Sequence, residues 1–365
     1  MTSKAFGLAQ LGNVYDDGAL SNRNLIINGA MQVAQRGTSF TGPTNDYTLD
    51  RFVCYQTSGF LDVAQDSDAP NGFRNSLKTT VNTANASPAS TDLARIAYVV
   101  EAQDVSRLNY GSASAQTLTL SFWVKSTVAA DYTIFVYVDD PARSIVKGYT
   151  INSANTWEHK TITISGDTGG TGINDDNGVG IYYEFNLMAG STYSTAGAQD
   201  VWVSGGGTRA SGQTANCTTS GATWQITGVQ LEVGDLSTAT PFEHRPYSDE
   251  LQRCFRYYEQ WDCVDGENIH LGTSYNGQPV TAIKYVVRKR ASPTITLPTA
   301  GQTSGTISFL NGTGGYPTTT GTHSTSQVNN RGARIASSGY SGITSAQPAM
   351  LYTNGSTIFK FDAEL

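Results

Sequence analysis

Apolar and polar side chains alternate along much of the chain between residues 25 and 232. A period of two places the apolar side chains of a strand on one face and the polar side chains on the other. The pattern is clear over residues 118–124, 132–138, 159–164 and 179–187, and clusters of Asp, Asn and Gly between these segments indicate tight turns. Strands with one apolar face predict antiparallel sheets, and two such sheets packed face to face predict an all-β sandwich or jelly roll.

The last strand of this region breaks the alternation once. Its apolar positions run through Trp224 and Ile226 and then shift by one residue to Val229 and Leu231. A one-residue slip would turn half of the core side chains toward solvent unless a bulge absorbs it. We therefore expect a β-bulge at residues 227–228.

The pattern changes after residue 246. Four apolar residues then recur at helical spacing: Leu251, Cys254, Phe255 and Tyr258. Ser248 is placed to cap a helix, and two acidic residues follow in its first turn, where the helix dipole favours them. We expect one short helix of about three turns here and assign residues 247–262 as the connecting helix.

A second, smaller β domain is expected over residues 263–365. Three of its segments have the composition of short strands: residues 280–287, 293–297 and 306–310. Residues 311–330 are rich in Gly, Thr, Ser and Asn and resemble an exposed loop. Near the end, Asn354-Gly355 separates two β-type runs, 350–353 and 357–361, which predicts a hairpin.

The first 24 residues contain too few apolar side chains to form a core. We expect an arm that becomes ordered against another chain, the alternative being a disordered terminus. The expected organisation is thus an N-terminal arm (1–24), a jelly-roll β-sandwich (25–246), a connecting helix (247–262) and a C-terminal β domain (263–365).

Charge and cysteine content exclude several classes of partner. The 365-residue chain has a net charge of −7, and its one basic run is Arg288-Lys289-Arg290, whereas nucleic-acid binding needs clustered basic residues. Its apolar stretches fall far short of the roughly 20 residues that span a membrane. We therefore expect neither nucleic-acid binding nor membrane insertion. The four cysteines form no CxxC pair, so reduced, mostly buried thiols are expected in a protein folded in a cytosol.

Residues suited to catalysis are present but not in catalytic arrangements. The four histidines are His159, His244, His270 and His323, and neither a GxSxG motif nor metal-ligand spacing accompanies them. The glycine clusters lack the lysine of a phosphate-binding loop. Adjacent aspartates fall in turns, although a carboxylate pair for glycoside hydrolysis stays open as an alternative. Residues 174–177 offer oxygen ligands for calcium without the usual loop pattern. We expect no catalytic residues, no cofactor and no metal site.

Aromatic side chains at polar positions are the stronger candidates for binding. Flat rings stack on the apolar C–H faces of sugars, and they are equally enriched at subunit interfaces, so both readings stay open. The candidate glycan or interface residues are Trp157, Tyr182, Tyr275, Tyr316, Tyr340 and Tyr352, and Trp123 and Trp261 have the same character.

Several motifs resemble a family of bacteriophage tail-fibre and virion appendage proteins. The matching segments are residues 24–33 (NLIINGAMQV), 35–37 (QRG), 47–52 (YTLDRF), 120–125 (LSFWVK), 228–234 (GVQLEVG), 239–247 (ATPFEHRPY), 254–258 (CFRYY) and 361–365 (FDAEL). All but the last of these segments lie within roughly residues 24 to 260, and the last resembles the family's terminal strand. The first 23 residues and most of the C-terminal region match less clearly.

The resemblance implies a jelly-roll domain similar to carbohydrate-binding modules, in a homotrimeric fibre attached to a phage virion. Residues 1–24 would then anchor the chain to another virion protein, with Phe6, Leu8, Leu11 and Tyr15 as candidate anchor residues. The C-terminal domain would form the distal tip facing the host.

The function expected from these observations is that of a non-enzymatic tail fibre that binds a host-surface polysaccharide. A head fibre or capsid decoration protein is the first alternative, because it can use the same module. A polysaccharide depolymerase is the second, although the sequence lacks the long repeats of a β-helix.

Overall fold

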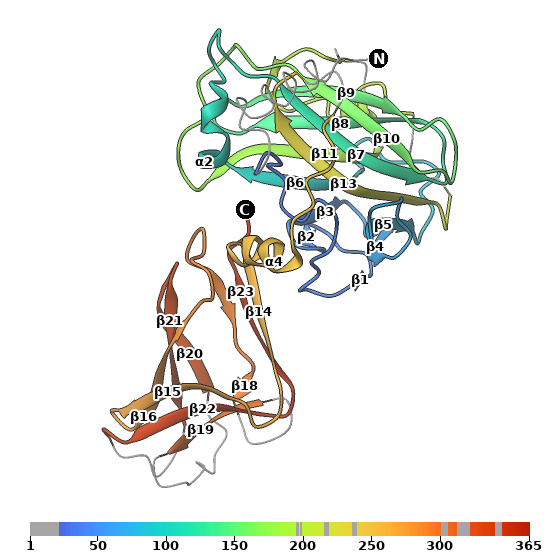
Figure 1. The fold of residues 1–365 in the computed structure, drawn as a ribbon. Helices are drawn as coiled ribbons and strands as arrows, with labels where there is room; N and C mark the ends of the chain where they lie inside the picture. Colours follow the sequence, from blue (N-terminus) through green and yellow to red (C-terminus); the bar gives the residue numbers. More distant parts are fainter. Residues whose placement is uncertain are drawn as a thin grey trace, which may run out of the picture. The chain divides into compact units, whose positions relative to one another are not determined.

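The computed structural model describes residues 22–194, 197, 199–214, 219–235, 239–300, 306–311, 322–339 and 345–365 (Figure 1). The candidate anchor residues Phe6, Leu8, Leu11 and Tyr15, and the aromatic candidates Tyr316 and Tyr340, lie outside these residues. The chain divides into two compact units, one comprising Met1–Glu250 with Leu365 and the other Leu251–Glu364.

The described part of the first unit consists of two antiparallel sheets. The first has the strand order β1 (Ser39–Phe40), β4 (Leu61–Asp66), β5 (Ser76–Val81), β13 (Thr223–Val233), β7 (Leu118–Ser126) and β10 (Glu158–Ile164). The second has the order β12 (Val203–Ser204), β9 (Arg143–Thr150), β8 (Asp131–Val138), β11 (Val179–Ala189), β6 (Leu93–Glu101), β3 (Phe52–Gln56) and β2 (Asp46–Tyr47). Short helical turns lie at α2 (Ala102–Val105), η1 (Ser106–Leu108) and α3 (Ser191–Ser194).

The core of this unit lies between the two sheets and is built by the predicted alternation. In β7, Leu120, Phe122 and Val124 are fully buried, and Ile134 and Val136 of β8 face them in the same apolar cluster. The prediction of an all-β fold with an antiparallel sandwich is therefore confirmed. Within the described residues, no helix has the length and apolar character needed to cross a membrane.

The predicted bulge is present in β13. Its pairing with β7 shifts register between Thr227 and Gln230, and Gly228 has a φ of 62°. Because of the shift, Ile226 and Leu231 both point into the core, each with 0% exposure. A glycine suits the bulge because a left-handed backbone conformation strains other residues.

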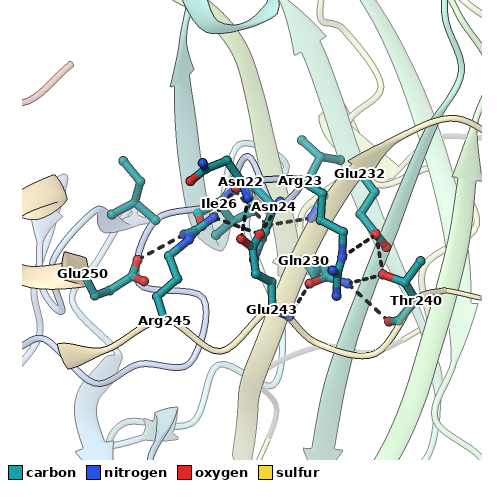
Figure 2. A network of polar contacts seen from close by, with 12 residues as sticks. Asn22, Arg23, Asn24, Ile26, Gln230, Glu232, Thr240, Glu243, Arg245 and Glu250 are labelled. Atoms are coloured by element: carbon teal, nitrogen blue, oxygen red, sulfur yellow. Dashed lines mark hydrogen bonds and ion pairs between the residues drawn. The ribbon is translucent and has the colours of Figure 1, made fainter. Parts of the chain in front are cut away.

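Two segments far apart in the sequence are tied together beside β13 (Figure 2). The carboxylate of Glu243 accepts hydrogen bonds from the backbone N–H of Asn22 (2.6 Å) and Asn24 (2.8 Å). The guanidinium of Arg245 donates to the carbonyl oxygen of Ile26 (3.1 Å). On β13, the side chain of Gln230 accepts from the Glu243 backbone (2.7 Å). We call this network the clasp and residues 239–246 the strap, which the clasp holds against the outer face of the first sheet.

The expected connecting helix is shorter than predicted. Helix α4 spans Tyr247–Phe255, so Ser248 lies inside it rather than capping it. Tyr258, which we expected on the apolar stripe of the helix, is instead the first residue of strand β14. The expectation of helix up to residue 262 is wrong because β14 pairs along its whole length with the last strand, from Tyr258 opposite Asp362 onward.

The described part of the second unit is also β-structure. One sheet has the order β14 (Tyr258–Cys263), β23 (Thr357–Asp362) and β17 (Thr294–Thr296). The other has the order β18 (Thr299–Ala300), β19 (Thr306–Asn311), β22 (Pro348–Asn354), β15 (Asn268–Tyr275), β16 (Gln278–Lys284), β21 (Gly332–Ser338) and β20 (Thr322–Asn329). Ile307, Ile335, Leu351, Phe359 and Phe361 are fully or almost fully buried in its core.

Two expectations for this unit are wrong. The runs on either side of Asn354-Gly355 are strands, but they belong to different sheets and do not form a hairpin: β22 pairs with β15 and β19, and β23 with β14 and β17. Part of the expected loop, residues 322–329, is strand β20 at the edge of a sheet. An edge strand buries few of its side chains. This segment therefore forms a strand although its Thr- and Ser-rich sequence has no apolar face.

Candidate functional site

The outer face of the second sheet carries a row of polar and aromatic side chains. Alternation in β11 turns Tyr183 and Phe185 into the core and leaves Tyr182 and Glu184 on the opposite face. Strand pairing sets Tyr182 directly opposite Tyr137 of β8. The register of the sheet therefore brings side chains from separate strands together on this face.

These residues line a hollow of about 450 Å³, which we call the tyrosine pocket. Its lining residues are Tyr55, Arg95, Tyr137, Asp139, Tyr182, Glu184, Gly206 and Arg209. They come from β3, β6, β8 and β11, from Asp139 directly after β8, and from the segment that follows β12. The size is within the roughly 300–1,000 Å³ of small-molecule sites.

A buried carboxylate organises the floor of the tyrosine pocket. Glu184 is 3% exposed, and both of its carboxylate oxygens accept from Nη1 of Arg209, at 2.8 and 2.9 Å. Nε of Arg95 lies 3.2 Å from one of these oxygens. A charge buried to this extent needs such partners, because removal from water otherwise costs several kcal/mol. Glu184 thus fixes the position of two guanidinium groups.

The same guanidinium groups pack against aromatic rings. Arg95 lies over the ring of Tyr55, 4.6 Å from its centre, and Arg209 lies over Phe135 at 4.8 Å. Gly206 stands beside Phe135 and Tyr137; a methyl group there would contact both at ordinary distances of 3.5 and 3.7 Å. The pocket therefore combines rigid rings with hydrogen-bond donors held in place before any ligand arrives.

Ionisation in the tyrosine pocket follows from burial. Partial burial, reinforced by the charge of Asp139, raises the pKa of Tyr182 to about 12, and burial also raises the pKa of Tyr55. Burial and the neighbouring Asp140 carboxylate raise the pKa of Asp139. The hydroxyls of Tyr55 and Tyr182 are therefore protonated at neutral pH and can donate hydrogen bonds.

Of the predicted glycan candidates that the structure describes, Tyr182 alone lines the tyrosine pocket. Trp157 directly precedes β10 of the other sheet, and its indole N–H donates to Asp68 (3.1 Å). Tyr275 and Tyr352 belong to the second unit, at the end of β15 and within β22; Tyr275 is 61% exposed.

Sequence reasoning missed most of the tyrosine pocket. Tyr55, Arg95, Tyr137, Glu184 and Arg209 were not singled out as candidates. The available signal was the polar residues at alternate positions of β11, Tyr182, Glu184 and Asn186, in a strand whose other positions are apolar.

The described residues contain no group of three or more His, Cys, Asp or Glu side chains arranged to hold a metal ion. In the candidate calcium loop, the side chain of Asn174 donates to Asp140 (2.9 Å), and Asp176 accepts from the backbone of Gly178 (2.7 Å). The carboxylate of Asp176 is thus engaged in a local turn contact, as expected for Asp in a turn.

No protein-family model matches the chain, and no curated protein matches it. Solved structures show distant similarity. The enzymatically active domain of tailspike protein 4 from bacteriophage CBA120 matches 58% of this chain, with 15% identity and a TM-score of 0.32; this chain covers 21% of that protein.

Two further similar structures are a putative sugar binding protein from Bacteroides thetaiotaomicron and the xylan-binding domain CBM22-1 of Paenibacillus barcinonensis Xyn10C. The first has 11% identity and a TM-score of 0.34, covering 57% of this chain and 99% of that one. The second has 11% identity and a TM-score of 0.27, covering 55% and 94%. Similarities at this level do not assign a family or a function to the chain.

Proposed function

We propose that this chain is a non-enzymatic tail-fibre protein of a bacteriophage that binds a host-surface polysaccharide through the tyrosine pocket. The observation that carries the proposal is the arrangement of Tyr137 and Tyr182 beside the Arg209–Glu184 pair on the outer face of the sandwich. The rings offer stacking surfaces for sugar C–H groups, and the fixed polar groups can bond sugar hydroxyls.

Binding fits the pocket better than hydrolysis. Glycoside hydrolysis requires two carboxyl groups that are free to act as acid, base or nucleophile. Of the two in the pocket, Glu184 has both oxygens engaged by Arg209 and is closed off from solvent. Asp139 alone cannot supply both roles, so the proposal is of a receptor site that leaves its ligand intact.

The test is a glycan array of bacterial surface polysaccharides probed with the full chain. Tyr182→Ala should lower the apparent affinity about tenfold, because it removes a stacking ring and a hydroxyl. Tyr275→Ala, which removes an exposed tyrosine of the second unit, is the matched control and should change nothing. Wild-type binding that depends on Tyr275 and not on Tyr182 would overturn the proposal, as would release of new reducing ends.

The virion assignment in the proposal draws on the sequence resemblance. We propose that the arm of residues 1–24, whose last three residues are held by the clasp, anchors the chain to another virion protein. We also propose that three copies form the fibre and that the chain folds in the host cytoplasm before assembly. The three described cysteines, Cys54, Cys254 and Cys263, are buried, as expected for thiols of a protein that folds in a reducing compartment.

Cryo-electron microscopy of the intact virion tests this assignment. Trimers that project from the tail, with residues 1–24 bound to a tail protein, would support it. Copies on the capsid instead would make the chain a head fibre or decoration protein, and monomeric chains on the virion would contradict the trimer.

A further inference from the structure

A second hollow of about 450 Å³ lies on the outer face of the first sheet, on the opposite side of the sandwich from the tyrosine pocket. One wall is the sheet itself, where Trp123 of β7 stands opposite His159 of β10. The other wall is the strap, held in place by the clasp. We call this hollow the aromatic pocket.

Aromatic rings surround the hollow on both sides. Trp123 and His159 have ring centres 5.1 Å apart and form a platform on the sheet. Facing them, Phe73, Phe242 and His244 form a triangle with ring centres 5.0, 5.2 and 4.9 Å apart. Such separations are typical of favourable aromatic contacts. Each of the two groups of rings is therefore stabilised by contacts among its own members.

The floor of the aromatic pocket depends on a glycine. A side chain at Gly228 would place its Cβ 2.6 Å from the ring of Phe73 and 3.1 Å from that of Trp123. The predicted bulge therefore does more than shift the register of β13. It also places a residue without a side chain next to the rings of Phe73 and Trp123.

Polar contacts with β13 and with the segment at residues 22–26 hold the strap in place (Figure 2). Gln230 donates to the carbonyl oxygen of Thr240 (3.3 Å), and its own carbonyl oxygen accepts from the backbone of Glu243 (2.7 Å). Arg23 forms an ion pair with Glu232 (3.2 Å), whose carboxylate also accepts from Thr240. A wall held in this way loses little freedom when a ligand binds, which favours affinity.

Among the residues that the structure describes, none that lines the aromatic pocket is Lys, Arg, Asp or Glu. Partial burial lowers the pKa of His159 from 6.5, so its imidazole is neutral at neutral pH. Ser121, Asn71 and Thr240 add uncharged hydrogen-bonding groups at the edge. Rings with neutral polar groups match a ligand that has an apolar face and hydroxyl groups but no charge.

We propose that the aromatic pocket binds the apolar face of an uncharged pyranose ring, as a second carbohydrate site distinct from the tyrosine pocket. The sugar stacks on Trp123 between the sheet and the strap, and its hydroxyls bond the neutral side chains at the edge. The aromatic pocket and the tyrosine pocket share no lining residues. An experiment can therefore disprove binding at one of them without disproving binding at the other.

The test uses fluorine NMR of the full chain labelled with 5-fluorotryptophan, with the Trp123 signal assigned through Trp123→Phe. The probes are methyl β-D-glucopyranoside and methyl β-D-galactopyranoside. The Trp123 signal should shift and saturate with a Kd on the order of 1–10 mM. The signal of Trp224, which is buried in the core at 3% exposure, should not move and reports that the fold is intact.

Variants separate this site from the tyrosine pocket. Phe73→Ala should weaken the response of Trp123 about tenfold, and His244→Ala, at an exposed position, should weaken it without a risk to folding. Tyr182→Ala should leave it unchanged. The proposal is overturned if neither sugar shifts the Trp123 signal at about 50 mM, if the shift persists in both pocket variants, or if Tyr182→Ala abolishes it.

Discussion

Nη1 of Arg209 lies 2.8 and 2.9 Å from the two carboxylate oxygens of Glu184, one of the least exposed acidic side chains in the sandwich. The pair joins a segment outside the sheet to the central strand β11. It therefore serves the fold and the proposed binding site at once, because the guanidinium that neutralises Glu184 also forms a wall of the tyrosine pocket.

We predict that Arg209→Met destabilises the first unit by about 1–3 kcal/mol, because it leaves Glu184 buried with one partner fewer. The expected loss of stability is smaller than for a fully buried ion pair because the Arg209 side chain is 27% exposed. Lys147→Met is the matched control, since its partner Asp200 is 64% exposed, and it should cost less than about 0.5 kcal/mol. Urea denaturation measures both, and equal losses would show that Glu184 does not need Arg209.

We predict that Gly228→Ala is more destabilising than Gly205→Ala. Both residues have positive φ, 62° and 78°, so both substitutions bear the backbone strain of about 1 kcal/mol. Only at Gly228 does the new methyl group meet a ring, that of Phe73, which adds about 1–3 kcal/mol for overpacking. Thermal or urea unfolding of the two variants makes the comparison, and similar costs would mean that Phe73 moves aside freely.

We predict that Glu243 makes the clasp sensitive to acid. Burial alone would raise the pKa of Glu243, but hydrogen bonds from the Asn24 and Asn22 backbones and the charge of Arg245 lower it below its usual 4.5. A lowered pKa in the folded state contributes stability above the unfolded pKa, and this contribution is lost as the pH falls through the folded value.

The wild-type protein should therefore lose more stability than Glu243→Gln when the pH is lowered from about 6 to about 3. Urea midpoints measured across this range give the comparison. Parallel curves for the two proteins would contradict the role assigned to Glu243.

We predict that the native thiols are protected from alkylation. Cys54, Cys254 and Cys263 are buried, and burial raises the pKa of Cys263 to about 11. In a Cys217→Ser background, the folded chain should react slowly with iodoacetamide at about pH 8, and the unfolded chain should react rapidly at all three remaining thiols. Mass spectrometry counts the adducts, and fast labelling of the folded chain would contradict the described burial.

The sandwich could be predicted because burial follows a period of two. The apolar positions of β7, β8 and β11 identify the inner face without knowledge of strand partners, and the slip in β13 identifies the bulge. The order in which strands pair within a sheet does not follow from this periodicity. Asn354-Gly355 indicated a turn correctly, but local sequence does not say which strands pair, and β22 and β23 join different sheets.

The tyrosine pocket was largely beyond sequence reasoning for the same reason. Tyr182 was a candidate because it is an aromatic residue at a polar position. Tyr55 and Tyr137 join it only because β3, β6, β11 and β8 lie side by side, although β3 and β8 are far apart in the chain. Arg209 comes from a segment without regular structure, so no periodicity points to it.

The most direct test is a structure of the full chain with an oligosaccharide chosen from the glycan array. We predict sugar rings against Tyr137 and Tyr182, with hydroxyls bonded to Arg209, and an intact glycosidic chain. Sugar bound only in the second unit or only in the aromatic pocket, or a cleaved product in the tyrosine pocket, would contradict it.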